Sequence, residues 1–305
     1  MLELSSQQIR YFRLCSHHLD RTYRKEDCLA VAGACGLQNS PPGAWETALY
    51  TRIPELSPAQ MNGLLYRDRT LLQAWSFRGA PYVFPQSESG IFLSALIPKE
   101  GEPWIYTRGI TLALDYLQME FQELLSILLH VIPILDGQTI TAKSTLDETL
   151  ARWMLPYIPP EKQKRWQDPS MYGSPDKQTV GGAVVSFLLR PCAFLGLVVF
   201  GERRGTSPTF TSLRAWTGQT SKADPDSAKQ LVRKYLHCYG PSAVDGLAAW
   251  LGCSGQQARR IWNTVKDEIE PAKVLGKRVF FLSEDREQLL SPSLPENSLI
   301  LLGRP

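Results

Sequence analysis

Apolar residues in the first part of the chain recur at the three- and four-residue spacing of amphipathic helices. Residues 5–19 carry this pattern and predict the first helix. The same reasoning predicts further helices over 26–37, 45–53 and 57–67. Ser57, with Gln60 three residues later, is a capping box at the start of the last one. Two β-prone runs then predict a hairpin over 71–84. Helices followed by a hairpin are the order of a winged helix.

The same order recurs in the middle of the chain. Helices over 111–135 and 141–157 precede a polar stretch, 159–177, whose four prolines predict a linker or an extended loop. An apolar helix over 179–189 then leads into a hairpin whose turn is predicted at 201–205.

The clearest unit lies near the C-terminus. Three amphipathic helices are predicted over 224–238, 243–251 and 254–269. Between the second and the third, Gly252 permits a tight turn and Ser254 caps the next helix, which is the pattern of a helix-turn-helix. A hairpin with its turn at Gly276 and Lys277 follows as a wing.

These patterns predict a mainly α protein with small β-hairpins, an α+β fold of tandem winged-helix (helix-turn-helix) units. We expect a first unit over 1–110 that carries the candidate active site, a second over 111–222 and a third over 223–305. Residues 298–305 have the pattern of a starting strand, after which the sequence stops. This leaves open whether the third unit is truncated at its C-terminus.

Composition narrows the class of protein. With 43% hydrophobic and 21% charged residues among 305, the chain is typical of globular proteins, which excludes a disordered or fibrous one. The net charge is only +3, so any surface that binds nucleic acid must be local. The longest apolar runs, about ten residues, are too short to cross a bilayer, and the N-terminus lacks the apolar stretch of a signal peptide. We therefore expect a cytoplasmic protein that does not associate with a membrane.

Metal and cofactor sites are not indicated. None of the six cysteines forms a C-x-x-C pair, and the four histidines show no zinc-ligand spacing near them. The chain also lacks the G-x-S-x-G, H-E-x-x-H and P-loop motifs. We expect no metal, no small-molecule cofactor and free thiols in a reducing compartment.

A local basic surface is predicted in the third unit. Its last helix has an apolar face and an opposite face of cationic and amide side chains: Gln256, Gln257, Arg259, Arg260, Asn263 and Lys266. Arginine and lysine bind phosphates, while glutamine and asparagine can reach base edges, so this helix is a candidate recognition helix. The wing adds Lys273, Lys277 and Arg278. The alternative is a solvated charged face, and for the hairpin pair Arg203 and Arg204 a phosphate contact and a solvated turn are equally open.

The best polar candidate for chemistry is Gln38-Asn39-Ser40, which is followed by two prolines. The simpler interpretation of this segment is a helix C-cap and turn. The interpretation as a site for chemistry is favoured by a resemblance to a known family. The segments that carry it are Gly36-Leu37-Gln38-Asn39-Ser40, Ala48-Leu49-Tyr50-Thr51-Arg52 and Leu72-Gln73-Ala74-Trp75-Ser76-Phe77-Arg78-Gly79. They resemble the AlkZ-like DNA glycosylases, a family of tandem winged helices that excises alkylated bases.

The resemblance implies a role for each residue of this segment. The family's catalytic motif, glutamine, any residue, then glutamine or aspartate, falls on Gln38 and Ser40, and this chain departs at the second position. Gln38 would orient the hydrolytic water and Ser40 would assist. The resemblance also implies damaged double-stranded DNA as the partner.

The expected DNA-contacting residues come from all three predicted units. They are Asn39, Arg78, Arg203, Arg204, Arg259, Arg260, Lys277 and Arg278. Two alternatives stay open: a non-catalytic winged-helix regulator or damage sensor, and a protein-interaction scaffold.

Overall fold

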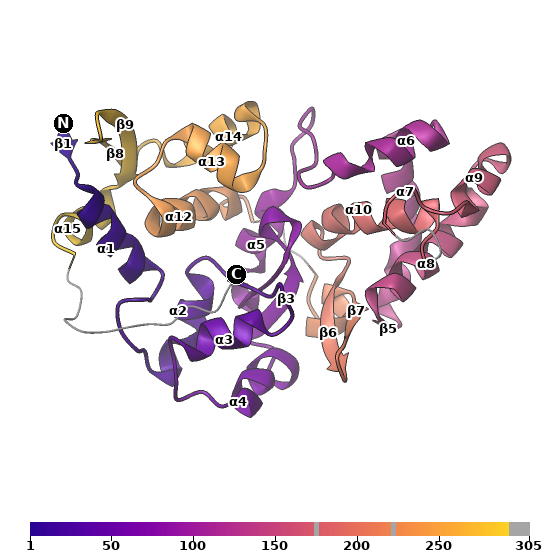
Figure 1. The fold of residues 1–305 in the computed structure, drawn as a ribbon, viewed down its shortest axis with the longest axis horizontal. Coiled ribbons are helices and arrows are strands. Elements are labelled where there is room, and N and C mark those ends of the chain that lie inside the picture. Colours follow the sequence, from indigo (N-terminus) through magenta and orange to yellow (C-terminus); the bar gives the residue numbers. More distant parts are fainter. Residues whose placement is uncertain (174–176, 221–223, 293–305) are drawn as a thin grey trace. The chain divides into compact units, whose positions relative to one another are not determined.

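The computed structural model describes residues 1–173, 177–220 and 224–292, which form two compact units (Figure 1). The first unit contains Met1–Leu72, Ala80–Pro103 and the described residues from 224 onward. The second contains Gln73–Gly79 and the described residues from 104 to 220. The predicted first and third segments therefore share one unit, which differs from the three separate segments read from the sequence.

The N-terminal part of the first unit is a set of short helices around a small sheet. In chain order its elements are α1 (Ser6–Ser16), α2 (Cys28–Gly33), β2 (Leu37–Gln38), α3 (Ala44–Tyr50), α4 (Pro58–Asn62), a π-helical turn (Gly63–Arg67), β3 (Leu71–Trp75), β4 (Pro81–Pro85) and α5 (Ser89–Phe92). The strands form a sheet in the order β2-β4-β3, so β2 is an edge strand. Buried Trp45, Leu49 and Val83 form part of the core beside it.

The C-terminal part of the first unit contains the three predicted helices and the predicted hairpin, but the third helix ends at Trp262 and Ile269, its predicted last residue, begins a strand. Its elements are α12 (Ser227–Tyr239), α13 (Val244–Leu251), α14 (Gly255–Trp262), β8 (Ile269–Val274), β9 (Lys277–Leu282) and α15 (Arg286–Leu290). Gly252 has the left-handed conformation (φ +66°) that the turn requires, and the Ser254 side chain accepts a hydrogen bond from the Gln257 amide. The predicted turn between α13 and α14 is therefore confirmed.

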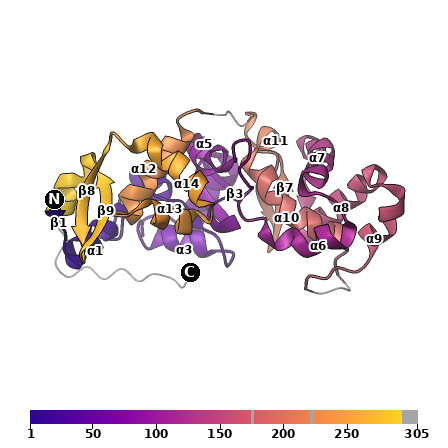
Figure 2. The ribbon, with the colours of Figure 1, turned by 90° about the horizontal axis from the view of Figure 1, so that it is seen from above.

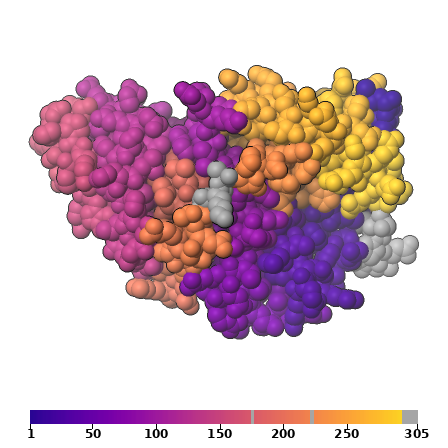
Figure 3. All heavy atoms as spheres, turned by 180° about the vertical axis from the view of Figure 1, so that it is seen from behind, coloured from indigo at the N-terminus to yellow at the C-terminus, as the bar shows by residue number. Residues whose placement is uncertain are grey.

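The N-terminal and C-terminal parts of the first unit are held together by strand pairing and by a small shared core. β1 (Leu2–Glu3) pairs in parallel with β8, beside β9 (Figures 1 and 2). Phe12 of α1 is buried in one cluster with Phe281 and Leu289. In the space-filling view the indigo N-terminal atoms accordingly lie against the yellow C-terminal ones (Figure 3). This long-range pairing is the reason that the first and third predicted segments form one unit, because apolar faces of both are buried together.

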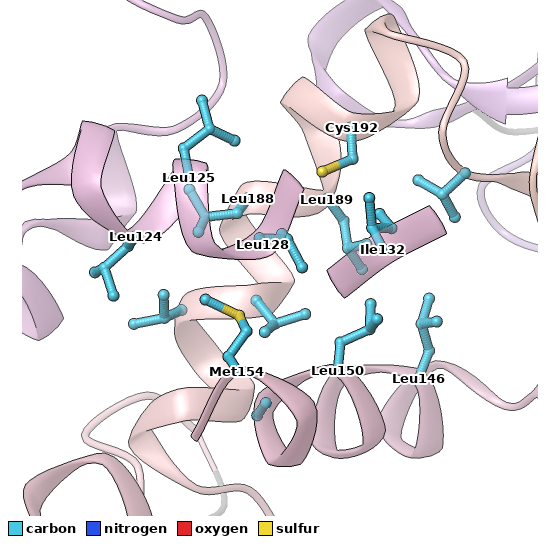
Figure 4. Close-up of a cluster of buried hydrophobic side chains, with 14 of the residues drawn as sticks. Leu124, Leu125, Leu128, Ile132, Leu146, Leu150, Met154, Leu188, Leu189 and Cys192 are labelled. Atoms are coloured by element: carbon cyan, nitrogen blue, oxygen red, sulfur yellow. The ribbon is translucent and has the colours of Figure 1, made fainter. Parts of the chain in front are cut away.

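The second unit is a helical bundle with its own small sheet. Its elements are α6 (Thr111–Leu117), α7 (Phe121–Val131), β5 (Ile140–Thr141), α8 (Lys143–Met154), α9 (Gln163–Gln167), α10 (Val180–Phe194), β6 (Val199–Arg204), β7 (Ser207–Thr211) and α11 (Leu213–Thr217). The strand order is β5-β7-β6. Leu128 of α7, Leu150 of α8 and Leu188 of α10 point toward one another in the core (Figure 4).

Short 3-10 turns connect the longer elements of both units. They are Lys25–Asp27, Phe77–Gly79, Gln86–Glu88, Ser94–Leu96, Arg108–Ile110, Ile132–Asp136, Leu155–Tyr157, Pro160–Lys162, Asn263–Val265 and Ser283–Asp285.

Within the described residues no single helix is long and apolar enough to cross a membrane. The helix pair Arg108–Leu117 and Phe121–Asp136, bent by 96°, does reach the required length and apolar composition.

Three local predictions were wrong. The single helix over 111–135 is broken at Gln118, whose φ of +52° ends α6. The predicted linker over 159–177 contains α9, whose Trp166 is 2% exposed and packs into the bundle. The predicted turn over 201–205 is mostly strand, since β6 extends to Arg204. The predicted strand at 298–305 lies outside the described residues.

Candidate functional site

Gln38 lies on the edge strand β2, opposite Tyr82 of β4. The Tyr82 hydroxyl donates a hydrogen bond to Gln38 Oε1 at 3.3 Å. Gln38 is half-buried, and its carbonyl oxygen keeps a second lone pair for another donor. Tyr82 therefore orients the Gln38 side chain, while Oε1 can still accept a hydrogen bond from another donor.

The turn before Gln38 depends on a glycine. Gly36 has a φ of +74°, and a Cβ at this position would lie 2.9 Å from both the Tyr82 and the Phe92 rings. The close approach of these rings brings Tyr82 to the strand that carries Gln38. The predicted helix over 26–37 ends at Gly33, so Gln38 is part of a sheet, and the interpretation of this segment as a helix C-cap was wrong.

Asn39 is buried, whereas the adjacent Ser40 is exposed. Asn39 is 4% exposed, and its Oδ1 accepts a hydrogen bond from the Gly43 amide at 2.7 Å. The backbone N–H of Asn39 donates a hydrogen bond to the Pro81 carbonyl oxygen at 2.8 Å. Asn39 therefore closes the loop before α3, and this placement does not support the DNA contact predicted for it. Ser40 is exposed and Gln38 is half-buried, so both side chains are accessible to solvent.

Two of the predicted cations in the second unit lie on its surface. Arg78 is exposed, with a φ of +59°, and precedes Gly79, whose φ is +67°. Arg204 is exposed at the end of β6, next to Gly205. Arg203 is half-buried and already interacts with another residue of the structure.

The candidate recognition helix α14 presents fewer free groups than its sequence suggests. Arg259 is exposed, and its side chain forms no hydrogen bond within the described residues. Arg260 instead forms a bidentate ion pair with Glu102, at 2.5 and 2.6 Å. The Glu102 side chain is 6% exposed, and the guanidinium lowers the pKa of its carboxyl. Gln257 is buried. Arg260 therefore connects α14 to the 99–102 loop, and the structure does not support it as a phosphate contact.

The hairpin of β8 and β9 presents a basic tip. Lys277 and Arg278 are both exposed, and the Arg278 guanidinium lies 5.2 Å from the centre of the Phe280 ring. Leu275 at the turn is 85% exposed and Gly276 has a φ of +76°. The predicted hairpin is thus formed, with Lys277 and Arg278 accessible to solvent.

Comparison with known proteins identifies the family. The family model described as DNA glycosylase AlkZ-like matches residues 31–303. The chain belongs to the AlkZ-like DNA glycosylase family. The predicted resemblance is therefore confirmed.

A relative in sequence and a solved structure, both from Streptomyces sahachiroi, match this chain over most of its length. The interstrand DNA cross-link repair glycosylase of Streptomyces sahachiroi is 25% identical over 316 residues, which cover 99% of this chain and 76% of that protein. The solved structure of Streptomyces sahachiroi DNA glycosylase AlkZ matches with a TM-score of 0.70 and 22% identity, over 96% of this chain and 74% of that chain. The mainly helical fold with small sheets is confirmed, while the tandem winged-helix description remains a prediction.

Tyr82 is the residue of this candidate site that the sequence did not single out. The sequence places it in the segment Arg78-Gly79-Ala80-Pro81-Tyr82. Its contact with Gln38 joins residues 44 positions apart, so a local pattern carries no signal for it. In the described residues no group of three or more histidine, cysteine, aspartate or glutamate side chains could hold a metal ion.

Proposed function

We propose that this protein hydrolyses the N-glycosidic bond of alkylated or cross-linked bases in double-stranded DNA, with a water oriented by Gln38. The observation that carries the proposal is the Gln38 carbonyl oxygen, held by Tyr82 at 3.3 Å on the open edge of a sheet. The family and the name of its cross-link repair relative support DNA as the substrate.

The proposed chemistry needs little from the protein. Alkylation at N7 of guanine or N3 of adenine gives the base a positive charge, so the bond between C1′ and nitrogen breaks with its electrons returning to the base. Water then adds to the oxocarbenium-like C1′, and the proton that it loses passes to a neighbouring solvent molecule. Gln38 accepts one hydrogen bond from that water, and the exposed Ser40 hydroxyl, two residues along the chain, accepts a second. Both groups position the water, and a strong base is dispensable.

The exposed cations supply the proposed DNA surface. Arg78 and Arg204 in the second unit and Arg259, Lys277 and Arg278 in the first are accessible to phosphates. We assign the helices and hairpins that carry them to winged helices, in which a helix and a wing both contact the duplex. Arg203 contributes only if it exchanges its present partner for a phosphate.

A second candidate function is a damage sensor or regulator that binds DNA without hydrolysis. Ser40 favours it, because serine stands where the family motif has glutamine or aspartate and its side chain is shorter. A sensor would bind damaged duplex and release nothing, while a regulator would prefer one undamaged sequence.

Base release separates these functions. We expect the protein to release N7-methylguanine or N3-methyladenine from a methylated duplex, or to release the modified base of an interstrand cross-link, and to release no base from undamaged DNA. The released bases are measured by chromatography with mass detection. Binding to damaged duplex without any release would contradict the enzyme and favour the sensor.

The assignment of the DNA surface has its own test. Replacement of Arg259 by alanine is expected to lower the slope of log Kd against log salt by about 0.9, since each phosphate contact releases about that many counterions. Arg278→Ala is expected to behave in the same way. Arg260→Ala is the matched control from the same helix, and its slope should equal that of the wild type, because Glu102 already neutralises Arg260. If Arg259→Ala leaves the slope unchanged, α14 is not part of the DNA surface.

A further inference from the structure

A cluster of charged side chains lies inside the second unit, between α8 and α10. Lys143 Nζ donates to Asp147 Oδ1 and Oδ2 at 2.5 and 2.6 Å, and to Ser186 Oγ at 2.9 Å. These three hydrogen bonds use all the N–H groups of the lysine. Arg190 Nη1 donates to the backbone carbonyl of the same Ser186. Ser186 therefore connects the two cations.

The cluster holds two cations and one carboxylate. Asp147 is 3% exposed, and its carboxylate is hydrogen-bonded to Lys143. Burial raises the pKa of Asp147 to about 6 and lowers the pKa of both Lys143 and Arg190. Arg190 has no carboxylate of its own, and among the described residues its one hydrogen bond is the one to Ser186. Asp147 attracts both Lys143 and Arg190, so two cations share one carboxylate and the cluster keeps a net positive charge. Partly buried excess charge is costly, so an external anion would be bound favourably here.

Arg190 is half-buried, so part of its side chain is accessible to solvent. Among the described residues its only side-chain hydrogen bond uses Nη1, which leaves Nε and Nη2 without a protein acceptor. A guanidinium presents its N–H groups as a planar fork, which matches two oxygens of a phosphate. Arg190 thus keeps the groups that a phosphate contact requires.

An aromatic wall holds this guanidinium in place. The Trp75 ring centre lies 5.8 Å from both the Arg190 guanidinium and the Lys143 ammonium. Trp75 itself is 5% exposed and stacks on Phe210 at 5.3 Å. This packing restricts the rotamers of Arg190 before any ligand is bound, which lowers the entropic cost of binding.

The backbone of Arg78 and Gly79 passes close to the stem of Arg190. A Cβ at Gly79 would lie 3.2 Å from the Tyr106 Cβ and 3.8 Å from the Arg190 Cγ. Arg78 and Gly79 both have a positive φ, so the chain bends sharply there, and Arg78 is exposed. The conformation thus brings the backbone of an exposed arginine beside a half-buried one.

We propose that Arg190 binds one phosphodiester group of the DNA strand, and that the Lys143–Asp147 pair positions it by holding Ser186. This inference rests on the proposed function for its ligand, because a DNA glycosylase meets phosphodiesters whenever it binds its substrate. Inorganic phosphate offers the same oxyanion, so the experiment must separate the two sources.

The first test is the salt dependence of binding to a methylated duplex. Arg190→Gln is expected to lower the slope of log Kd against log salt by about 0.9 and the affinity about tenfold. Arg67→Gln is the matched control, since Arg67 is an exposed arginine that pairs with the adjacent Asp68 at 2.9 Å, and its slope should equal that of the wild type. A folded Arg190→Gln variant with the wild-type slope would overturn the proposal.

The second test uses the unaltered protein, so it does not depend on how the variant folds. Phenylglyoxal modifies accessible arginines, and mass spectrometry measures the extent at each one. We expect Arg190 to be modified in the free protein and protected by duplex DNA, with Arg67 unaffected. Modification of Arg190 that DNA does not reduce, or no modification at all, would overturn the proposal. Protection by inorganic phosphate but not by DNA would identify a free anion as the ligand and would overturn it as well.

The two hypotheses fail in different ways. A wild-type protein that excises bases while Arg190 shows no protection refutes only this inference. A wild-type protein that binds no DNA refutes the proposed function itself.

Discussion

Replacing Gln38 with alanine is expected to lower base release from a methylated duplex by about 100-fold or more, with DNA binding unchanged. The variant removes the carbonyl oxygen that positions the water and leaves the exposed cations in place. Single-turnover release and Kd are measured side by side, because a change confined to the rate is the signature of a group that acts on the chemical step. Gln7→Ala, an equal truncation in α1 where Gln7 is exposed, is the control and should keep the wild-type rate.

Two further substitutions define how Gln38 works. Tyr82→Phe removes the hydroxyl that holds Gln38 Oε1, so we expect a smaller loss, about tenfold, because the amide is still present but less well oriented. Ser40→Asp restores the second position of the family motif on an exposed residue, and we expect it to raise the rate. A Gln38→Ala variant that releases base as fast as the wild type would contradict this account of the site. The role of Tyr82 would be contradicted by a Tyr82→Phe variant with the wild-type rate.

Gly181→Ala is expected to destabilise the second unit by about 3 kcal/mol. The added Cβ would lie 2.3 Å from Cε2 and 2.4 Å from Nε1 of Trp166. Trp166 cannot move aside easily, because it is 2% exposed and its Nε1 donates to the Ala151 carbonyl at 3.0 Å. A shift of the ring would break this hydrogen bond and leave a buried donor unsatisfied.

Urea unfolding of the two glycine variants measures this effect. Gly137→Ala is the matched control in the same unit, since the nearest atom to its added Cβ is the Ile134 carbonyl oxygen at 3.8 Å, an ordinary contact. Its free energy of unfolding should stay within about 0.5 kcal/mol of the wild type. If Gly181→Ala unfolds at the same urea concentration as the control, the close packing of Trp166 on α10 is not what holds α9 in place.

Features that depend on neighbours a few residues away were predicted well. The capping box of Ser57 and Gln60 is present, and so are the left-handed Gly252 and the Ser254 cap. The hairpin after residue 71 and the hairpin with its turn at Gly276 also form where the sequence places them. Caps and turns satisfy backbone groups within three or four positions, so the residues that decide them are visible in a short stretch of sequence.

Predictions that needed a distant partner were less successful. The arginines of α14 look equivalent in sequence, yet Glu102, 158 positions away, engages Arg260 and leaves Arg259 exposed. The prolines of 159–177 suggested a linker, but burial of Trp166 in the bundle overrides them. In both cases packing energy from another part of the chain exceeds the local preference.

The sequence by itself determined the family, the positions of most helices and hairpins, and Gln38 as the candidate for catalysis. Only the tertiary structure decided which polar side chains are already paired within the protein and which can still bind a ligand. It directs Asn39 inward to the Gly43 amide, places Tyr82 against Gln38, and leaves Arg190 without a carboxylate of its own. The physical reason is that local chain stiffness and capping select secondary structure, whereas the partner of a polar side chain depends on which distant segments are buried beside it.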